Sequence, residues 1–144
     1  MRFMMIVKAS MDSEAGKLPS EELLSAMGKY NEELMKAGVL VDLSGLQPTS
    51  KGARVKFSGG KATVIDGPFA ETKELIGGYW IINVKSKAEA IEWARRAPAP
   101  HGPDQDGEIE IRQFFELEDF APSEVIERHA ELGKYLAKTK KQSH

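Results

Sequence analysis

Two segments of this chain, residues 2–8 and 76–84, carry apolar side chains at both sets of alternating positions. Successive side chains of a β-strand point to opposite faces of a sheet, so Phe3 and Met4 belong to different faces. A strand that is apolar on both sides belongs to a sheet with both faces covered. We therefore predict a sheet that contains both segments and that needs a covering layer on each side.

A helix is predicted between Ser20 and Gly38. Ser20 is a suitable N-cap, and the two glutamates that follow it favour the N-terminal end of a helix dipole. Apolar residues then recur at helical spacing, and Gly38 suits the position just after the last helical residue. This stripe consists of Leu23, Met27, Tyr30 and Leu34. The polar residues 9–19 before the helix are predicted to form a loop, and a strand begins at residues 39–41 after it.

A β-hairpin is predicted around residues 58–61. Residues 54–57 and 62–65 have the composition of strands. Between them Gly59 and Gly60 accept the positive φ angles that tight hairpin turns require. The hairpin therefore interrupts the chain between two sheet-forming segments.

The second half of the chain supplies another helix and another strand. Ser86 and Glu89 have the spacing of a capping box, which predicts a helix that Pro98 ends. Residues 108–117 alternate in polarity, which indicates a strand. Its inward set is expected to be Ile109, Ile111 and Phe115. A last helical stripe follows Pro122.

Without the hairpin, the order of elements is β-α-β-β-α-β, which predicts an α+β fold of the ferredoxin-like type. In that fold both helices cover one face of the sheet and leave the other face bare. A second copy of the chain can cover the bare face, so we predict a homodimer that forms an α/β-barrel. Residues 1–121 are expected to form the domain, and residues 122–144 a C-terminal helical extension.

Composition excludes several classes of site. The chain has no cysteine, which excludes disulfides, thiolate metal sites and a cysteine nucleophile. Its three histidines are scattered without ligand spacing, so we expect neither a metal nor another cofactor. Twenty basic and 22 acidic residues argue against direct binding of nucleic acid. The apolar start is too short for a signal peptide or a membrane span, so a cytoplasmic protein without a membrane partner is expected.

The near-neutral total conceals two blocks of charge. Residues 104–131 hold ten acidic and two basic residues, and the last eleven residues hold four lysines and no acidic residue. A solvated acidic face and a lysine-rich helix end explain both blocks, because cations stabilise the C-terminal end of a helix. Docking of a protein partner is the alternative.

Residues 66–74, with the sequence Asp-Gly-Pro-Phe-Ala-Glu-Thr-Lys-Glu, and the Gly-Gly-Tyr-Trp that starts at Gly77 resemble the DGPF-domain proteins of the YCII-related family. The resemblance covers roughly residues 1–120. Supporting segments are 33–40, 45–48, 89–93 and 108–112.

The resemblance implies a dimeric ferredoxin-like fold. Most such proteins have no assigned activity, but a few act on small ring compounds in a pocket between sheet and helix. Some DGPF-type proteins resemble accessory partners of alternative sigma factors. The family is also known for a histidine–aspartate pair whose histidine lies on the first helix. The predicted first helix here has Tyr30 and Asn31 in its place, so that pair does not carry over.

Asp66 and Tyr30 are the candidate catalytic residues. A carboxylate at a strand end beside Phe69 could act as a general acid or base. The alternative is that Asp66 only caps the Asp-Gly-Pro turn. Tyr30 could present its phenol to a pocket under the helix, or it could be a core tyrosine with a satisfied hydroxyl.

The candidate substrate-binding residues lie in two loops. They are Gln47, Phe69, Glu71, Thr72 and Lys73. Lys73 or Thr72 could bind an anionic ligand, whereas a solvated loop is the alternative. His101 lies in another loop, where it could serve a site or simply be exposed.

Two functions from different classes remain open. The first is a small enzyme that performs cofactor-free acid–base chemistry, of the isomerase or lyase type, on a small organic acid or ring compound. The second is a non-catalytic ligand-binding or accessory protein that is linked to transcription through a protein partner.

Overall fold

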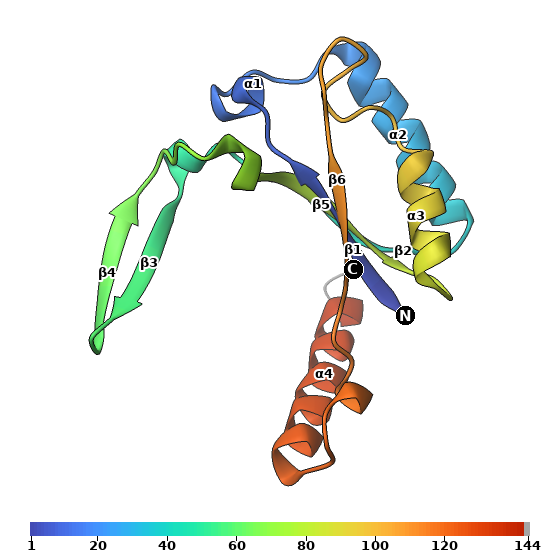
Figure 1. Ribbon diagram of the computed structural model, residues 1–144. Coiled ribbons are helices and arrows are strands. Elements are labelled where there is room, and N and C mark those ends of the chain that lie inside the picture. The colour runs from blue at the N-terminus through green and yellow to red at the C-terminus, as the bar shows by residue number, and fades with distance from the viewer. Residues whose placement is uncertain (143–144) are drawn as a thin grey trace. The chain divides into compact units, whose positions relative to one another are not determined.

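The computed structural model describes residues 1–142 and divides the chain into two units, the first ending at Gln113 and the second beginning at Phe114 (Figure 1). The first unit is built on a four-stranded antiparallel sheet with the strand order β2-β5-β1-β6. The strands are β1 (Arg2–Lys8), β2 (Leu40–Gly45), β5 (Ile76–Asn83) and β6 (Ile109–Gln113). The two doubly apolar segments, β1 and β5, are neighbours in the middle of this sheet, and the α+β fold class is confirmed.

Two helices, α2 (Glu21–Lys36) and α3 (Lys87–Arg95), lie on one face of the sheet (Figure 1). Ser20 caps α2 through the backbone N–H of Leu23, at 3.1 Å, as predicted. Ser86 likewise accepts from the N–H of Glu89 at the start of α3. The other half of the predicted box differs, because the Glu89 carboxylate accepts from the N–H of Lys85.

The prediction of a loop throughout residues 9–19 is wrong. A short helix, α1 (Met11–Glu14), follows β1. Its N-terminus is stabilised because Ser10 and Ser13 each accept the other's backbone N–H, at 3.0 and 2.9 Å. Two serines in a polar stretch gave no helical periodicity, so the turn depends on this local exchange of hydrogen bonds.

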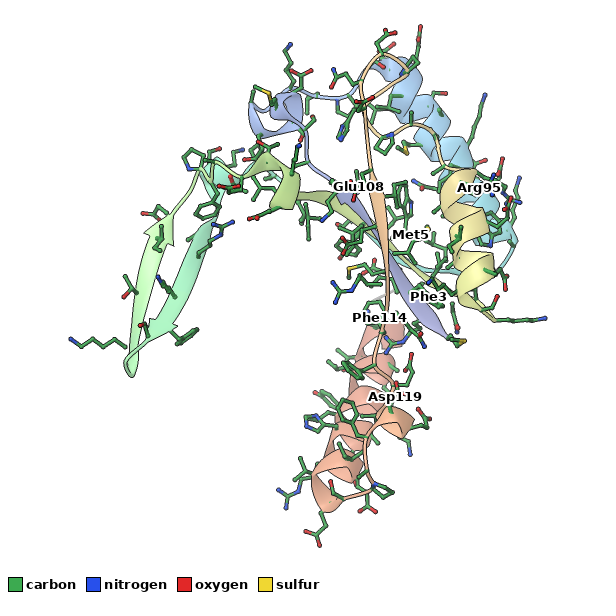
Figure 2. All side chains as sticks on the ribbon, in the orientation of Figure 1. Phe3, Met5, Arg95, Glu108, Phe114 and Asp119 are labelled. Atoms are coloured by element: carbon green, nitrogen blue, oxygen red, sulfur yellow. The ribbon has the colours of Figure 1, made fainter. Side chains whose placement is uncertain are left out.

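The hydrophobic core lies between the sheet and the two helices. Phe3 and Met5 of β1 are fully buried there, and Figure 2 shows both on the side of the sheet that α3 covers. Tyr30 and Leu34 supply the predicted stripe of α2. The remaining buried members are Trp80, Ile82, Val84 and Ala90. On the opposite face Met4, Tyr79 and Ile81 are only half-buried, whereas Ile6 is buried.

The predicted hairpin forms a separate two-stranded sheet of β3 (Ala53–Ser58) and β4 (Lys61–Asp66) (Figure 1). Gly59 and Gly60 both have positive φ angles, as the turn requires. Every residue of both strands is exposed. The hairpin therefore owes its shape to its own ladder and to the turns at its base.

The second unit begins where the sequence pattern predicted that the strand would continue. Strand β6 ends at Gln113, so the inward placement predicted for Phe115 is wrong. Phe115 is 74% exposed and lies beside Phe120, with ring centroids 5.2 Å apart. A 3-10 turn at Leu117–Asp119 ends the extended chain, because the Asp119 carboxylate accepts the N–H of Glu116. Helix α4 (Glu124–Gln142) follows, as predicted.

Candidate functional site

Three cavities of the first unit share one side chain, that of His101. The largest of the three has a volume of about 340 Å³ and is lined by Ser13, Lys17 and Gln47 besides His101. A second cavity, of about 310 Å³, lies on the side of Lys8 and Lys73. The third, of about 210 Å³, extends toward Ser20 at the start of α2. We call the 340 Å³ space the His101 cavity.

The backbone of β1 fixes the orientation of the His101 ring. Its Nε2 atom lies 2.8 Å from the backbone carbonyl oxygen of Lys8. A carbonyl oxygen only accepts, so Nε2 carries the hydrogen and donates it. In a neutral ring Nδ1 then keeps its lone pair, which is the arrangement that a general base needs. The contact therefore selects the tautomer of His101.

The loop that carries His101 is shaped by its own turn. Gly102 has a φ of +87°, and its N–H donates to the carbonyl of Ala99 at 3.0 Å. Pro100 lines the His101 cavity beside the imidazole ring. The half-buried ring is thus held between a turn of its own loop and the last residue of β1.

Cationic and amide groups surround the His101 cavity. Lys17 follows α1, and its ammonium lies 3.8 Å from the Asp12 carboxylate, a pair that is largely exposed. Gln47 also lines this cavity, and its side-chain oxygen accepts from the ammonium of Lys51 at 3.4 Å. The cavity therefore offers an imidazole, an ammonium and an amide to a small ligand.

The residues that follow β4 are held by Thr49. The Thr49 hydroxyl donates to the Glu14 carboxylate of α1 and accepts the backbone N–H of Phe69, the latter at 3.1 Å. A Cβ atom at Gly67 would overlap the carbonyl of Thr49, so only glycine permits this approach. The guanidinium of Arg54 lies 3.8 Å from the centre of the Phe69 ring. The Asp-Gly-Pro-Phe block thus docks the hairpin base onto α1.

The two predicted catalytic residues lie in different surroundings. Asp66 is exposed at the end of β4, opposite Ala53, and borders none of the three cavities at His101. Tyr30 is buried on α2, and its hydroxyl donates to the carbonyl of Trp93 at 2.7 Å. Tyr30 also borders none of these cavities, so the structure does not bring the pair together at His101.

The surroundings of Tyr30 are those of a core residue. Its ring meets that of Trp80 edge to face, with centroids 5.4 Å apart. Burial raises the pKa of the Tyr30 hydroxyl to about 12, although the nearby Arg96 acts in the opposite direction. The neighbouring Asn31 accepts the indole N–H of Trp80 at 2.7 Å. Tyr30 and Asn31 therefore both take part in hydrogen bonds that tie α2 to the sheet and α3.

The predicted substrate-binding residues are divided between cavities. Gln47 borders the His101 cavity and also a space of about 420 Å³ at the base of the hairpin, which Phe69 borders too. Lys73 borders the 310 Å³ cavity next to His101. Glu71 and Thr72, at the 3-10 turn before β5, border none of these four spaces.

Sequence reasoning did not place His101, Ser13 or Lys17 in a shared site. The contact between His101 and Lys8 joins residues that are 93 positions apart, and no motif in the sequence predicts it. The available signals were a histidine in a loop, for which a site role stayed open, and the two prolines near it, which indicate a rigid loop.

The fold and cavities define a small α+β protein with a preformed concave site beside one histidine. A family model for the YCII-related domain matches residues 1–118, so the chain belongs to the YCII-related family. The chain is also 35% identical over 86 residues to an uncharacterised protein of Rhizobium meliloti (strain 1021). That alignment covers 60% of this chain and 69% of the relative. No helix within residues 1–142 is both long enough and apolar enough to span a membrane.

Proposed function

We propose that the chain binds a small organic acid, or a ring compound that carries an acidic group, in the His101 cavity. We further propose that His101 performs cofactor-free acid–base chemistry on this ligand. The observation that carries the proposal is the 2.8 Å contact between Nε2 of His101 and the carbonyl of Lys8. This contact holds the ring in one tautomer at the wall of a cavity of about 340 Å³.

The groups around the cavity suit that chemistry. The ammonium of Lys17 can pair with a carboxylate, and Gln47 can hydrogen-bond a second oxygen of the ligand. Nδ1 of His101 can then accept a proton from a carbon or hydroxyl of the bound molecule and return it elsewhere. An isomerisation needs only these two transfers. In an elimination the proton taken from carbon is returned to a departing hydroxyl, which leaves as water while a carbon–carbon double bond forms. Neither reaction consumes electrons or a second substrate.

Asp66 and Tyr30 are assigned supporting roles in this proposal. The Tyr30 hydroxyl is already bonded to the carbonyl of Trp93, and Asp66 ends a strand of the exposed hairpin. Lys73 borders the 310 Å³ cavity together with His101, and in this proposal its ammonium attracts an anion toward the imidazole. In this proposal His101, rather than Asp66, is the acid–base group.

The proposal is tested by thermal unfolding in the presence of a library of small carboxylic acids. A ligand at about 100 times its Kd stabilises a folded protein by about 2.7 kcal/mol, which such a screen detects. Any stabilising acid is then titrated calorimetrically against His101→Asn, with His129→Asn on α4 as the matched control, since His129 is exposed there. We expect His101→Asn to weaken binding or abolish turnover and His129→Asn to match the wild type. Equal binding and turnover by the two variants would contradict the proposal that the acid binds at His101.

We also propose that the first unit is ferredoxin-like with an inserted hairpin and that it belongs to the DGPF group of the family. The strand order β2-β5-β1-β6 and the placement of α2 and α3 on one face support this assignment. The half-buried Met4, Tyr79 and Ile81 on the other face support a homodimer in which two sheets face each other. Light scattering that gives about 16 kDa at all concentrations would contradict that dimer, since one chain is 15.9 kDa.

One observation favours the alternative of an accessory protein. On α4, Val125, Leu132 and Leu136 are each about 60% exposed, which leaves an apolar stripe open for a protein partner. The double variant Leu132→Glu/Leu136→Glu alters only this exposed stripe. Loss of a co-purifying partner, with ligand binding at His101 intact, is the result expected from a partner-binding role.

A further inference from the structure

We propose that the free edge of β6 pairs with β6 of a second copy of this chain. In this pairing the two strands are antiparallel and centred on Ile111. The two four-stranded sheets then join into one continuous sheet. This interface is separate from the facing of two sheets proposed above, because it uses a strand edge rather than a sheet face.

Alternate residues of β6 direct their backbone N–H and C=O groups toward the open edge, as such pairing requires. Among residues 1–142, β6 is an edge strand of the sheet and pairs with β1 alone. The N–H of Lys8 donates to the carbonyl of Glu108 at 3.0 Å, so this residue pair is a hydrogen-bonded one. Hydrogen-bonded and non-hydrogen-bonded pairs alternate along an antiparallel ladder. The N–H and C=O groups of residues 109, 111 and 113 therefore point away from β1, toward the open edge.

Only one register of self-pairing is compatible with the charges. Antiparallel strands place residues of the same sheet face opposite one another, so the centre can fall on Glu110, Ile111 or Arg112. A centre on Glu110 opposes two carboxylates, and a centre on Arg112 opposes two guanidinium groups. A centre on Ile111 places Glu110 opposite the partner's Arg112, twice over by symmetry. This register also uses every outward backbone group of β6 and gives the longest overlap.

The second copy is favoured as the occupant because this charge pattern complements itself. In the single chain Arg112 lies 3.5 Å from Glu110 and is 72% exposed, and Glu110 also contacts Lys8 at 3.4 Å. Exposed edges are often protected by proline, bulges or inward-pointing charges. β2, the other edge, has a register shift between Leu40 and Asp42. The register of β6 with β1 is unbroken over five residue pairs.

The helix side of the same edge carries apolar surface. A groove of about 320 Å³ between α3 and β6 is lined by Ile91, Ala94 and Pro98 together with Ile109 and Ile111. In the centred register the partner's Ile111 lies directly across from Ile111 on this side. Edge pairing would therefore extend the hydrogen-bonded ladder and cover part of this groove.

Disulfide trapping tests the register, because the chain has no cysteine of its own. In the variant Ile111→Cys the two thiols lie directly opposite one another. Their Cα atoms are expected to be about 5.5 Å apart, within disulfide range. Ile109→Cys is the matched control, since it changes the same residue type on the same strand and face. In the centred register the Cα atom of residue 109 and that of the partner's residue 109 are about 14 Å apart, which is too far for a disulfide.

We expect mild oxidation to convert most of Ile111→Cys to a covalent dimer and to leave Ile109→Cys at background. Mixing Ile109→Cys with Gln113→Cys should restore cross-linking, because those positions face each other. Thermal unfolding of the reduced variants establishes that each one is folded. Absence of the Ile111→Cys dimer at high protein concentration, or equal cross-linking of the two variants, would overturn the proposal.

Charge reversal provides an independent readout. Glu110→Arg and Arg112→Glu each place like charges across the pair, so sedimentation velocity should show weaker association for both. The double variant Glu110→Arg/Arg112→Glu restores the opposite signs and should restore association. Failure of that rescue contradicts the edge register even where a dimer through the sheet faces persists.

Discussion

The imidazole of His101 donates from Nε2 to the backbone carbonyl of Lys8 across 2.8 Å. This hydrogen bond joins a proline-flanked loop to the last residue of β1, and it leaves Nδ1 as the basic atom of a neutral ring. The site is thus placed at the end of the sheet where α1, the loop before β6 and the residues after β2 meet. The acid–base chemistry proposed above rests on this one orientation.

Tyr30→Phe separates a structural role of the phenol from a catalytic one. The variant loses the hydrogen bond to the carbonyl of Trp93, which also accepts the N–H of Arg96. Because that carbonyl keeps a partner, we expect the free energy of unfolding to fall by only about 0.5–1.5 kcal/mol in urea titrations. Binding of an acid at His101 should be unchanged. Abolished turnover in a stably folded Tyr30→Phe would show that the phenol is catalytic.

The raised pKa of Tyr30 predicts how the free energy of unfolding depends on alkaline pH. Its pKa is raised from 10.0 to about 12 by burial, so the folded chain retains the phenol proton more tightly than the unfolded chain. The stability that depends on the protonated phenol is fully present below pH 10 and is lost as the pH rises through about 12. We expect urea midpoints of the wild type to decline over this window more steeply than those of Tyr30→Phe. Equal declines of the urea midpoint in the wild type and in Tyr30→Phe would contradict a role of Tyr30 in this pH dependence.

Gly67→Ala is expected to destabilise the hairpin base. Its Cβ would overlap the carbonyl of Thr49, and forced overpacking typically costs about 1–3 kcal/mol. Gly28→Ala is the matched control, because Gly28 lies in α2 with open space around its Cβ position. Alanine is the better helix former there and should add about 0.5–1 kcal/mol. Thermal unfolding of both variants measures the difference, and a neutral Gly67→Ala would contradict the packing.

The ion pair of Lys8 and Glu110 is tested by Lys8→Met. The Lys8 ammonium, through a hydrogen bond and its charge, lowers the pKa of the Glu110 carboxyl. Removal of the ammonium should therefore raise this pKa toward the ordinary value. A carboxyl NMR titration follows Glu110 directly, with the exposed Glu118 as an internal reference. An unchanged Glu110 titration would contradict the ion pair.

Much of the fold was predictable because its signals are local. The stripe through Tyr30 and Leu34 correctly identified the buried face of α2, and the two glycines at 59–60 identified the hairpin turn. Phe115 was placed wrongly because its alternation continues past Gln113, the last residue of β6, which pairs with Phe3 near the start of β1. The local pattern reports the propensity of a segment, whereas the length of a strand is set by the partner strand with which it pairs.

The candidate site was less predictable, because its groups meet only in the folded chain. Asp66 and Phe69 stood out as a motif, yet the role of Gly67 and Phe69 in docking against Thr49 is visible only in three dimensions. His101 shares no motif with Lys8, and their contact closes a long loop. Lys17 falls in a polar stretch of the sequence, and only the fold of α1 places it at the same cavity as the imidazole.

Whether His101 is the acid–base group of the site is most directly tested by ¹⁵N NMR of the histidine rings. A stabilising carboxylic acid is titrated in, and His129 is the internal reference. We predict that free His101 shows the tautomer protonated at Nε2. We further predict that saturating acid shifts the Nδ1 signal of His101 while the His129 signals stay in place. A His101 ring in the other tautomer, or one that the bound acid leaves unchanged, would contradict the account.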